Sequence, residues 1–217
     1  MRNLCIYNAQ KIWIFSLLAL FLQKIVIKEM LEKLFKTAIS LIFKPSEAWK
    51  ELSLKQNDDH ESFLSGYVYP FIGLITLATF AGFLFARRGF DLQIAIKESI
   101  VIVLSMFGGF FLASYFINET RKKIFHRTHD IKLCQCFVGY SSSLIYSLHI
   151  VLSLIPEFFF LRILVIYTIY IVWEGAMPYM DIKESEQLKF TGISTLIIIL
   201  TPLAIAFIAG FLMPGLK

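Results

Sequence analysis

The sequence has few charged residues, since Asp, Glu, Lys and Arg make up only 17% of the 217 residues. Soluble domains carry about 25% charged and about 45–50% apolar residues. This chain is 57% hydrophobic, with a mean hydropathy of +0.69. It has too little polar surface to cover a globule in water, which excludes an ordinary soluble enzyme and a disordered chain. The composition predicts an integral membrane protein.

Cysteine is also scarce. Cys5, Cys134 and Cys136 are odd in number and have no framework spacing, so structural disulfides are not expected. His126 and His129 join the last two cysteines in the one metal-like group of the sequence. Their spacing, H-x2-H and C-x-C, does not match the wider spacing of paired zinc ligands. No metal and no cofactor is predicted.

The sequence lacks the motifs of known catalytic sites. It has no Gly-rich phosphate loop, no Ser–His or Cys–His arrangement and no paired carboxylates, so no catalytic residue is assigned and no enzyme is predicted. The net charge of +5 is not gathered into one basic stripe. A nucleic-acid partner is therefore not expected.

Long apolar runs dominate the second part of the chain. Each of five runs is long enough to cross a bilayer as a helix. The predicted fold class is all-α: a polytopic membrane protein with a five-transmembrane-helix bundle over residues 66–217, preceded by cytoplasmic amphipathic helices. The expected spans are 66–85, 99–117, 134–155, 158–180 and 191–213. Three pairs of small residues four positions apart favour close helix approach: Ala78/Gly82, Gly109/Ala113 and Ala206/Gly210.

Residues 30–65 have the pattern of amphipathic helices at a membrane interface. Apolar positions recur at helical spacing from Leu31 to Ile42, and the Lys44-Pro45 step is expected to end this helix. Ser46 is expected to cap a second helix over Glu47–Leu54. Its Trp49 is the predicted interfacial anchor, in a Lys-rich segment suited to the bilayer surface.

Residues 1–29 form an extension with three open interpretations. The apolar run Ile12–Leu22 resembles a signal-peptide core, but no small-x-small cleavage site follows it. As a helix it rises only about 16 Å, against about 30 Å of hydrocarbon. The segment is an interfacial helix, a short extra span or an artefact of a start upstream of Met30.

Basic residues indicate the orientation of the spans. Seven lie from Lys24 to Lys55, ahead of the first span, five follow the second span and two follow the fourth, against five on the opposite side. By the positive-inside rule, the N-terminus is predicted to be cytoplasmic and the C-terminus outside. The very short connection between the third and fourth runs makes these two helices antiparallel neighbours.

One charged residue falls inside a predicted span. Glu174 is expected about 9 Å from the cytoplasmic end of the fourth span, at the depth of four hydroxyl residues in the third. The candidate intramembrane polar cluster is Glu174, Tyr140, Ser141, Ser142 and Ser143. It is either a proton-coupled or polar-solute site, or a set of hydrogen bonds that holds helices together.

Several short stretches resemble the Yip-domain family of membrane proteins. They are Leu41–Leu52 with its Lys44-Pro45 step, Tyr69-Pro70, Val138-Gly139-Tyr140-Ser141, and Tyr167–Trp173 followed by Gly175. The resemblance covers residues 30–215 and includes no catalytic signature. Bacterial members often have a proline soon after the Gly-Tyr-Ser step, where this chain has Ser143-Leu144.

The resemblance implies a role without chemistry. Eukaryotic relatives act in membrane traffic with Rab-type GTPases, whereas bacterial relatives are inner-membrane proteins, and the Phe-, Ile- and Lys-rich composition favours a bacterial member. The first hypothesis is a non-enzymatic protein that acts through protein partners, a second copy of itself or the organisation of the lipid bilayer. The alternative is a small-solute, ion or proton-coupled transport component that uses Glu174 and the hydroxyls of the third span.

Overall fold

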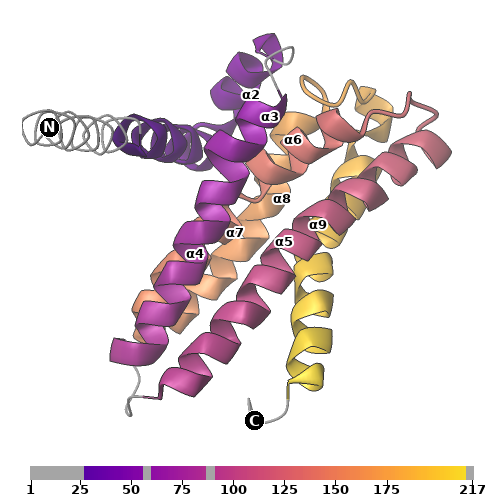
Figure 1. Ribbon diagram of the computed structural model, residues 1–217. Coiled ribbons are helices and arrows are strands. Elements are labelled where there is room, and N and C mark those ends of the chain that lie inside the picture. Colours follow the sequence, from indigo (N-terminus) through magenta and orange to yellow (C-terminus); the bar gives the residue numbers. More distant parts are fainter. Residues whose placement is uncertain (1–26, 56–59, 87–90, 214–217) are drawn as a thin grey trace, which may run out of the picture. The chain divides into compact units, whose positions relative to one another are not determined.

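A computed structural model describes residues 27–55, 60–86 and 91–213, which are almost entirely helical and contain no β-strand (Figure 1). The chain divides into a short unit, Met1–Thr37, and a main unit, Ala38–Lys217. The predicted all-α fold class is confirmed. Most of the extension predicted over residues 1–29 lies outside the described residues.

The helices before the first span are separated by a proline. Residues 27–43 are helical, and Lys44 leaves the helical region with φ −138° and ψ 59°, because the following Pro45 disfavours it there. Helix α2 then begins at Pro45 and runs over Pro45–Leu54. The predicted start was later, with Ser46 as the cap. Proline is well suited to the first turn because it has no N–H that needs a partner.

Four continuous helical segments are long and apolar enough to cross a membrane. The first, His60–Phe85, combines α3 (His60–Phe63), η1 (Leu64–Val68), α4 (Tyr69–Ala81) and most of η2 (Gly82–Ala86). The second is α5 (Leu92–Lys123), which begins where the Asp91 carboxylate accepts a hydrogen bond from the Ile94 N–H at 3.0 Å. The others are Pro156–Ala176 and α9 (Glu184–Leu212). All four begin before the predicted apolar runs, because helices continue into the flanking residues.

The third predicted span is a bent pair of helices. Helix α6 (Ile131–Ser141) and helix α7 (Ser143–Leu154) meet at an angle of 44° around Ser142. The Ser143 hydroxyl donates to the Tyr140 carbonyl, so a side chain occupies an acceptor next to the bend. Serine-rich steps commonly bend helices in this way. Counting the pair as one span gives up to five among the described residues.

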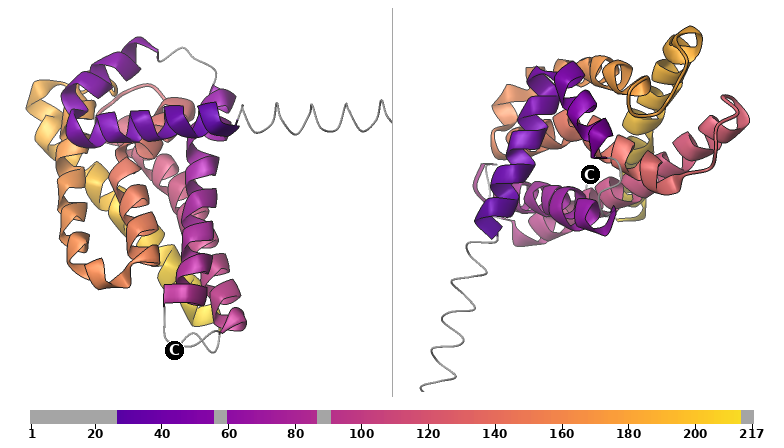
Figure 2. Two further views of the ribbon diagram at one scale, coloured as in Figure 1. Left: turned by 90° about the vertical axis from the view of Figure 1, so that its left-hand side faces the viewer. Right: turned by 90° about the horizontal axis from the view of Figure 1, so that it is seen from above.

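The fourth predicted span is also interrupted. It starts as a 3₁₀ helix, η3 (Pro156–Tyr167), and continues as α8 (Thr168–Ala176). Figure 2 shows α7 and η3 as a tight hairpin, as the short connection between the two runs predicted. The span ends at Ala176, four residues before the predicted end, and a turn that contains Pro178 follows.

Helix α5 is the centre of the main unit, where it packs against α4, α6 and α9. A Cβ on Gly109 would lie 2.8 Å from the Pro202 Cα, so the α5–α9 contact depends on this glycine. Gly82 likewise lies against the backbone of Ser153, whereas Gly210 faces open space. Two of the three predicted small-residue pairs therefore include a glycine at a close helix contact.

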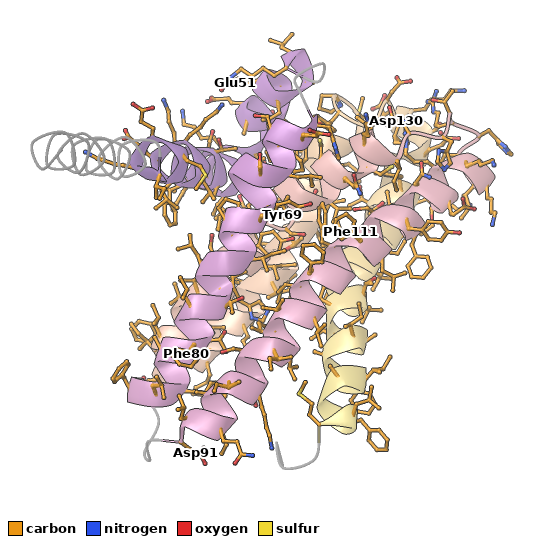
Figure 3. All side chains as sticks on the ribbon, viewed as in Figure 1. Glu51, Tyr69, Phe80, Asp91, Phe111 and Asp130 are labelled. Atoms are coloured by element: carbon orange, nitrogen blue, oxygen red, sulfur yellow. The ribbon has the colours of Figure 1, made fainter. Side chains whose placement is uncertain are left out.

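Side-chain distribution agrees with a membrane environment. Figure 3 shows Asp91 and Asp130 at opposite ends of α5, with the labelled aromatic residues Tyr69, Phe80 and Phe111 between these levels. Large apolar side chains are exposed on the outer faces of several spans, including Leu77, Phe107, Ile163 and Phe207. Such faces are the ones that contact lipid in a helical bundle.

Candidate functional site

Trp49 fastens α2 to the membrane-spanning helices. Its side chain is fully buried, and its indole N–H donates to the Ile171 carbonyl in α8 at 2.8 Å. The ring lies directly on Gly175, where a Cβ would approach a ring carbon to 2.5 Å. The indole that was predicted to anchor the chain in lipid headgroups is thus enclosed by protein in the structure.

The other side of the Trp49 ring contacts aromatic residues from separate elements. Its centroid lies 5.0 Å from Tyr179, 5.3 Å from Phe137 and 6.1 Å from Tyr140. Tyr140 also contacts Phe63, with the two ring centroids 4.8 Å apart. Tilted and edge-to-face pairs at these distances are favourable beyond their buried area. We call this set the aromatic cluster: Trp49, Phe63, Tyr67, Phe137, Tyr140 and Tyr179.

The aromatic cluster forms a well-packed neutral core. Burial raises the pKa of the Tyr179 phenol well above its ordinary value, so this group does not ionise near neutral pH. Gly139 allows Phe63 to approach α6, since a Cβ there would lie 2.6 Å from the Phe63 ring. The cluster therefore joins α2, α3, η1, α6 and the loop after α8 by packing.

The predicted hydroxyl residues lie at and beside the bend between α6 and α7. The Ser143 and Tyr67 hydroxyl groups are hydrogen-bonded at 2.6 Å, and this bond links the third span to the first. Ser142 interacts with the Tyr146 hydroxyl one turn further on. The buried Ser141 hydroxyl has no hydrogen-bond partner. Tyr140 belongs to the aromatic cluster.

Glu174 lies in different surroundings from these hydroxyls. It is half-buried, and its carboxylate interacts with the Tyr170 hydroxyl one turn earlier on the same span. It also lines an open depression of about 440 Å³ together with Lys50 of α2. The remaining lining residues are Ser46, Met177, Pro178 and Gln187. The structure therefore gives Glu174 and the serines different partners. That Glu174 and the hydroxyls form one polar cluster stays a prediction.

A buried polar group at the end of α5 was not predicted. Arg121 is only 4% exposed and donates to the Met180 carbonyl at 3.4 Å, although the sequence places it in a basic flank expected to face water. Asn118, one turn earlier, is fully buried, and its side-chain oxygen accepts from the Asp130 N–H at 3.0 Å. Asn118 and Arg121 are three residues apart, so they lie on the same face of a helix that continues to Lys123. This spacing was the signal that the sequence offered for a buried polar group.

The residues considered as metal ligands have other surroundings. The Cys134 thiol is buried next to the Asn118 side-chain oxygen, at 3.9 Å. His126 lies in the loop after α5 with a positive φ of 51°. Within residues 27–55, 60–86 and 91–213, no group of three or more His, Cys, Asp or Glu side chains is arranged to hold a metal ion.

These features define an all-helical integral membrane protein in which a short surface helix is built into a bundle of spans. The Yip1 domain matches residues 39–207, most of the chain. The chain therefore belongs to the Yip1 domain family. Comparisons with curated proteins and with solved structures gave no match.

Three of the four stretches that carried the family resemblance meet in space. Trp49 from the first stretch lies on Gly175 from the last, and Tyr140 from the third contacts Trp49 through its ring edge. The matched range also begins close to the first residue of the main unit, Ala38. Residues from three of the stretches that resemble the family thus lie at the contact between α2 and the spans.

Proposed function

We propose that this Yip1 domain protein is non-enzymatic and acts through protein partners or through the organisation of the bilayer. The observation that carries the proposal is the Trp49–Gly175 contact, which holds α2 firmly on α8. A helix held in this way presents a fixed outer face instead of a mobile one. Fixed charges on that face favour specific recognition over general attraction to lipid.

The outer face of α2 is rich in charge and mostly self-paired. Lys44 pairs with Glu47 at 3.2 Å, and Lys55 pairs with Glu51 at 2.6 Å. Lys50 instead lines the depression that Glu174 also lines. We assign this depression as the surface that meets a partner, because it combines opposite charges with the exposed apolar side chain of Met177.

The proposal includes a location and an orientation. We infer a bacterial inner-membrane protein with a cytoplasmic N-terminus and an external C-terminus, on the basis of its composition and its basic flanks. In that orientation α2 and the depression face the cytoplasm. The partner is then a cytoplasmic or membrane protein, or a second copy of this chain.

The test is affinity purification of a tagged chain from native membranes in mild detergent, followed by quantitative mass spectrometry. We expect a stoichiometric partner, or a second differently tagged copy, that is lost with Lys50→Glu. Lys55→Glu is the matched control, because it makes the same charge change at the residue that caps the C-terminal end of α2, away from the depression. Recovery of the chain alone, or equal loss of the partner in both variants, would contradict the proposal.

A further inference from the structure

Arg121 carries a buried charge that lacks a counter-ion. Its guanidinium donates from Nη2 to the Met180 carbonyl and lies against the Cys134 thiol, while Nε and Nη1 are buried without a hydrogen-bond partner. Among the described residues, no ion pair includes Arg121. A buried ion without a partner is strongly destabilising, so an arrangement of this kind calls for a compensating negative charge.

Asn118 and Arg127 are neighbours of Arg121 and carry further open donors. Asn118 and Arg121 both contact the Cys134 thiol, and the Asn118 oxygen is already occupied by the Asp130 N–H. This bond sets the orientation of the amide and leaves its Nδ2 buried without a partner. Arg127 is close by, since its backbone N–H donates to the Arg121 carbonyl at 3.1 Å.

Arg127 reaches the same loop as Arg121. Its Nη1 pairs with Asp181 at 3.3 Å, next to the Met180 carbonyl that Arg121 binds, and its Nε is buried without a partner. The four unpartnered atoms of these three residues are therefore all N–H donors: Asn118 Nδ2, Arg121 Nε, Arg121 Nη1 and Arg127 Nε. What the group lacks is acceptor oxygens.

Three acidic side chains of this region, Asp181, Asp130 and Glu119, are engaged elsewhere. Asp181 is 90% exposed at its side chain and binds Arg127 through Nη1, which leaves Nε open. The Asp130 carboxylate caps α6 by accepting from the Leu133 N–H at 2.9 Å. Glu119, one turn before Lys123, pairs with that lysine at 2.9 Å. Each of the three acidic side chains is thus engaged away from the open nitrogens.

We infer that Asn118, Arg121 and Arg127 form a binding site for a phosphate group. Phosphate offers several strong acceptor oxygens, and the planar guanidinium of arginine binds them in pairs. The site lies at the charged end of the candidate span Leu92–Lys123, the level at which phospholipid headgroups meet a membrane protein. The phosphate is either that of an anionic phospholipid or free inorganic phosphate, and both place the same group on the same donors.

The experiment uses the full chain, purified in detergent and stripped of co-purified lipid. Native mass spectrometry measures binding of phosphatidylglycerol, with phosphatidylcholine as the zwitterionic comparison. Thermal unfolding with and without inorganic phosphate measures the soluble ligand. We expect Arg121→Gln to weaken binding about tenfold or more, since it removes charge-assisted hydrogen bonds.

Lys123→Gln is the matched control. It removes an equal charge from an exposed side chain that lies two residues from Arg121 in the sequence. Arg127→Gln provides a second test with a less buried residue, which decides the matter if Arg121→Gln fails to fold. Loss of phosphatidylglycerol binding alone identifies a lipid headgroup as the source. Loss of phosphate stabilisation alone identifies the soluble anion. Binding that is absent from the unsubstituted chain, or equal in Arg127→Gln and Lys123→Gln, overturns the inference.

Discussion

The Trp49 indole and Gly175 are in direct contact, with the ring of the surface helix α2 lying where a side chain on α8 would otherwise project. The two residues are far apart in the sequence, and the Trp49 N–H adds a hydrogen bond to the Ile171 carbonyl at 2.8 Å. Their contact joins a short polar helix to a membrane span, and the first two predictions test it.

Substitution of Gly175 by alanine should destabilise the protein. The new Cβ would lie 2.5 Å from a ring carbon of a fully buried tryptophan, so α2 or α8 must shift. We expect a loss of about 1–3 kcal/mol, measured by denaturant unfolding in detergent micelles. Gly192→Ala is the control, because nothing lies within 4 Å of its Cβ position on α9. A Gly175→Ala protein as stable as the Gly192→Ala protein would mean that the two helices are loosely held.

Trp49→Phe should loosen α2 without disrupting the spans. Phenylalanine keeps an aromatic ring against Phe137 and Tyr179 but cannot donate to the Ile171 carbonyl. The loss is expected to be about 1 kcal/mol, typical of one hydrogen bond. Limited trypsin digestion should then cleave faster after Lys50 and Lys55. Trp173→Phe, which changes a half-buried tryptophan on α8, is the control. If the Trp49→Phe and Trp173→Phe proteins were cleaved at the same rate, the indole hydrogen bond would not be what holds α2 in place.

Gly109→Ala should weaken the packing of α5 on α9. A Cβ at this position would lie 2.8 Å from the backbone Cα of Pro202, which has no flexible end to move aside. We expect a loss of about 1–3 kcal/mol in the free energy of unfolding. At the adjacent Gly108, the same change meets only the end of the Ile205 side chain at 3.1 Å and should cost less. Equal losses for the two variants would contradict the close approach at Pro202.

The Tyr67–Ser143 hydrogen bond should appear as a coupling energy between the first and third spans. The two hydroxyl oxygens are 2.6 Å apart in the buried interior. A double-mutant cycle with Tyr67→Phe and Ser143→Ala should give about 0.6 kcal/mol, the usual value for such bonds in membrane proteins. Unfolding midpoints in a denaturing detergent series provide the four stabilities. Strict additivity would indicate that the two hydroxyls do not stabilise each other.

Proton or ion flux should not depend on Glu174. Because its carboxylate interacts with Tyr170 and lines an open depression, we expect it to take no part in a proton relay through the hydroxyls of the third span. Proteoliposomes with the unsubstituted chain should match empty liposomes in a pH-dependent flux assay, and Glu174→Gln should change nothing. A flux that disappears with Glu174→Gln would favour the transport hypothesis over the proposed one.

The predicted polar cluster illustrates how far a count of residues along helices reaches. Depth alone placed Glu174 level with Tyr140 and the serines, but depth does not say toward which neighbour each side chain points. The bend of 44° at Ser142 and the 3₁₀ start of the fourth span set those directions, and neither was predicted. The bend depends on a local competition in which the Ser143 hydroxyl takes the Tyr140 carbonyl.

The sequence by itself determined the class of the protein, its helical spans and the proline boundary before α2, because hydropathy and the loss of helical geometry before proline are local properties. Family membership was also readable from the short stretches around Trp49, Gly139 and Gly175. Only the tertiary structure decided that Trp49 is enclosed by protein and that Arg121 is buried. Both depend on which helices pack together, and a basic or aromatic residue at the end of a span looks the same in sequence whether lipid, water or another helix lies beside it.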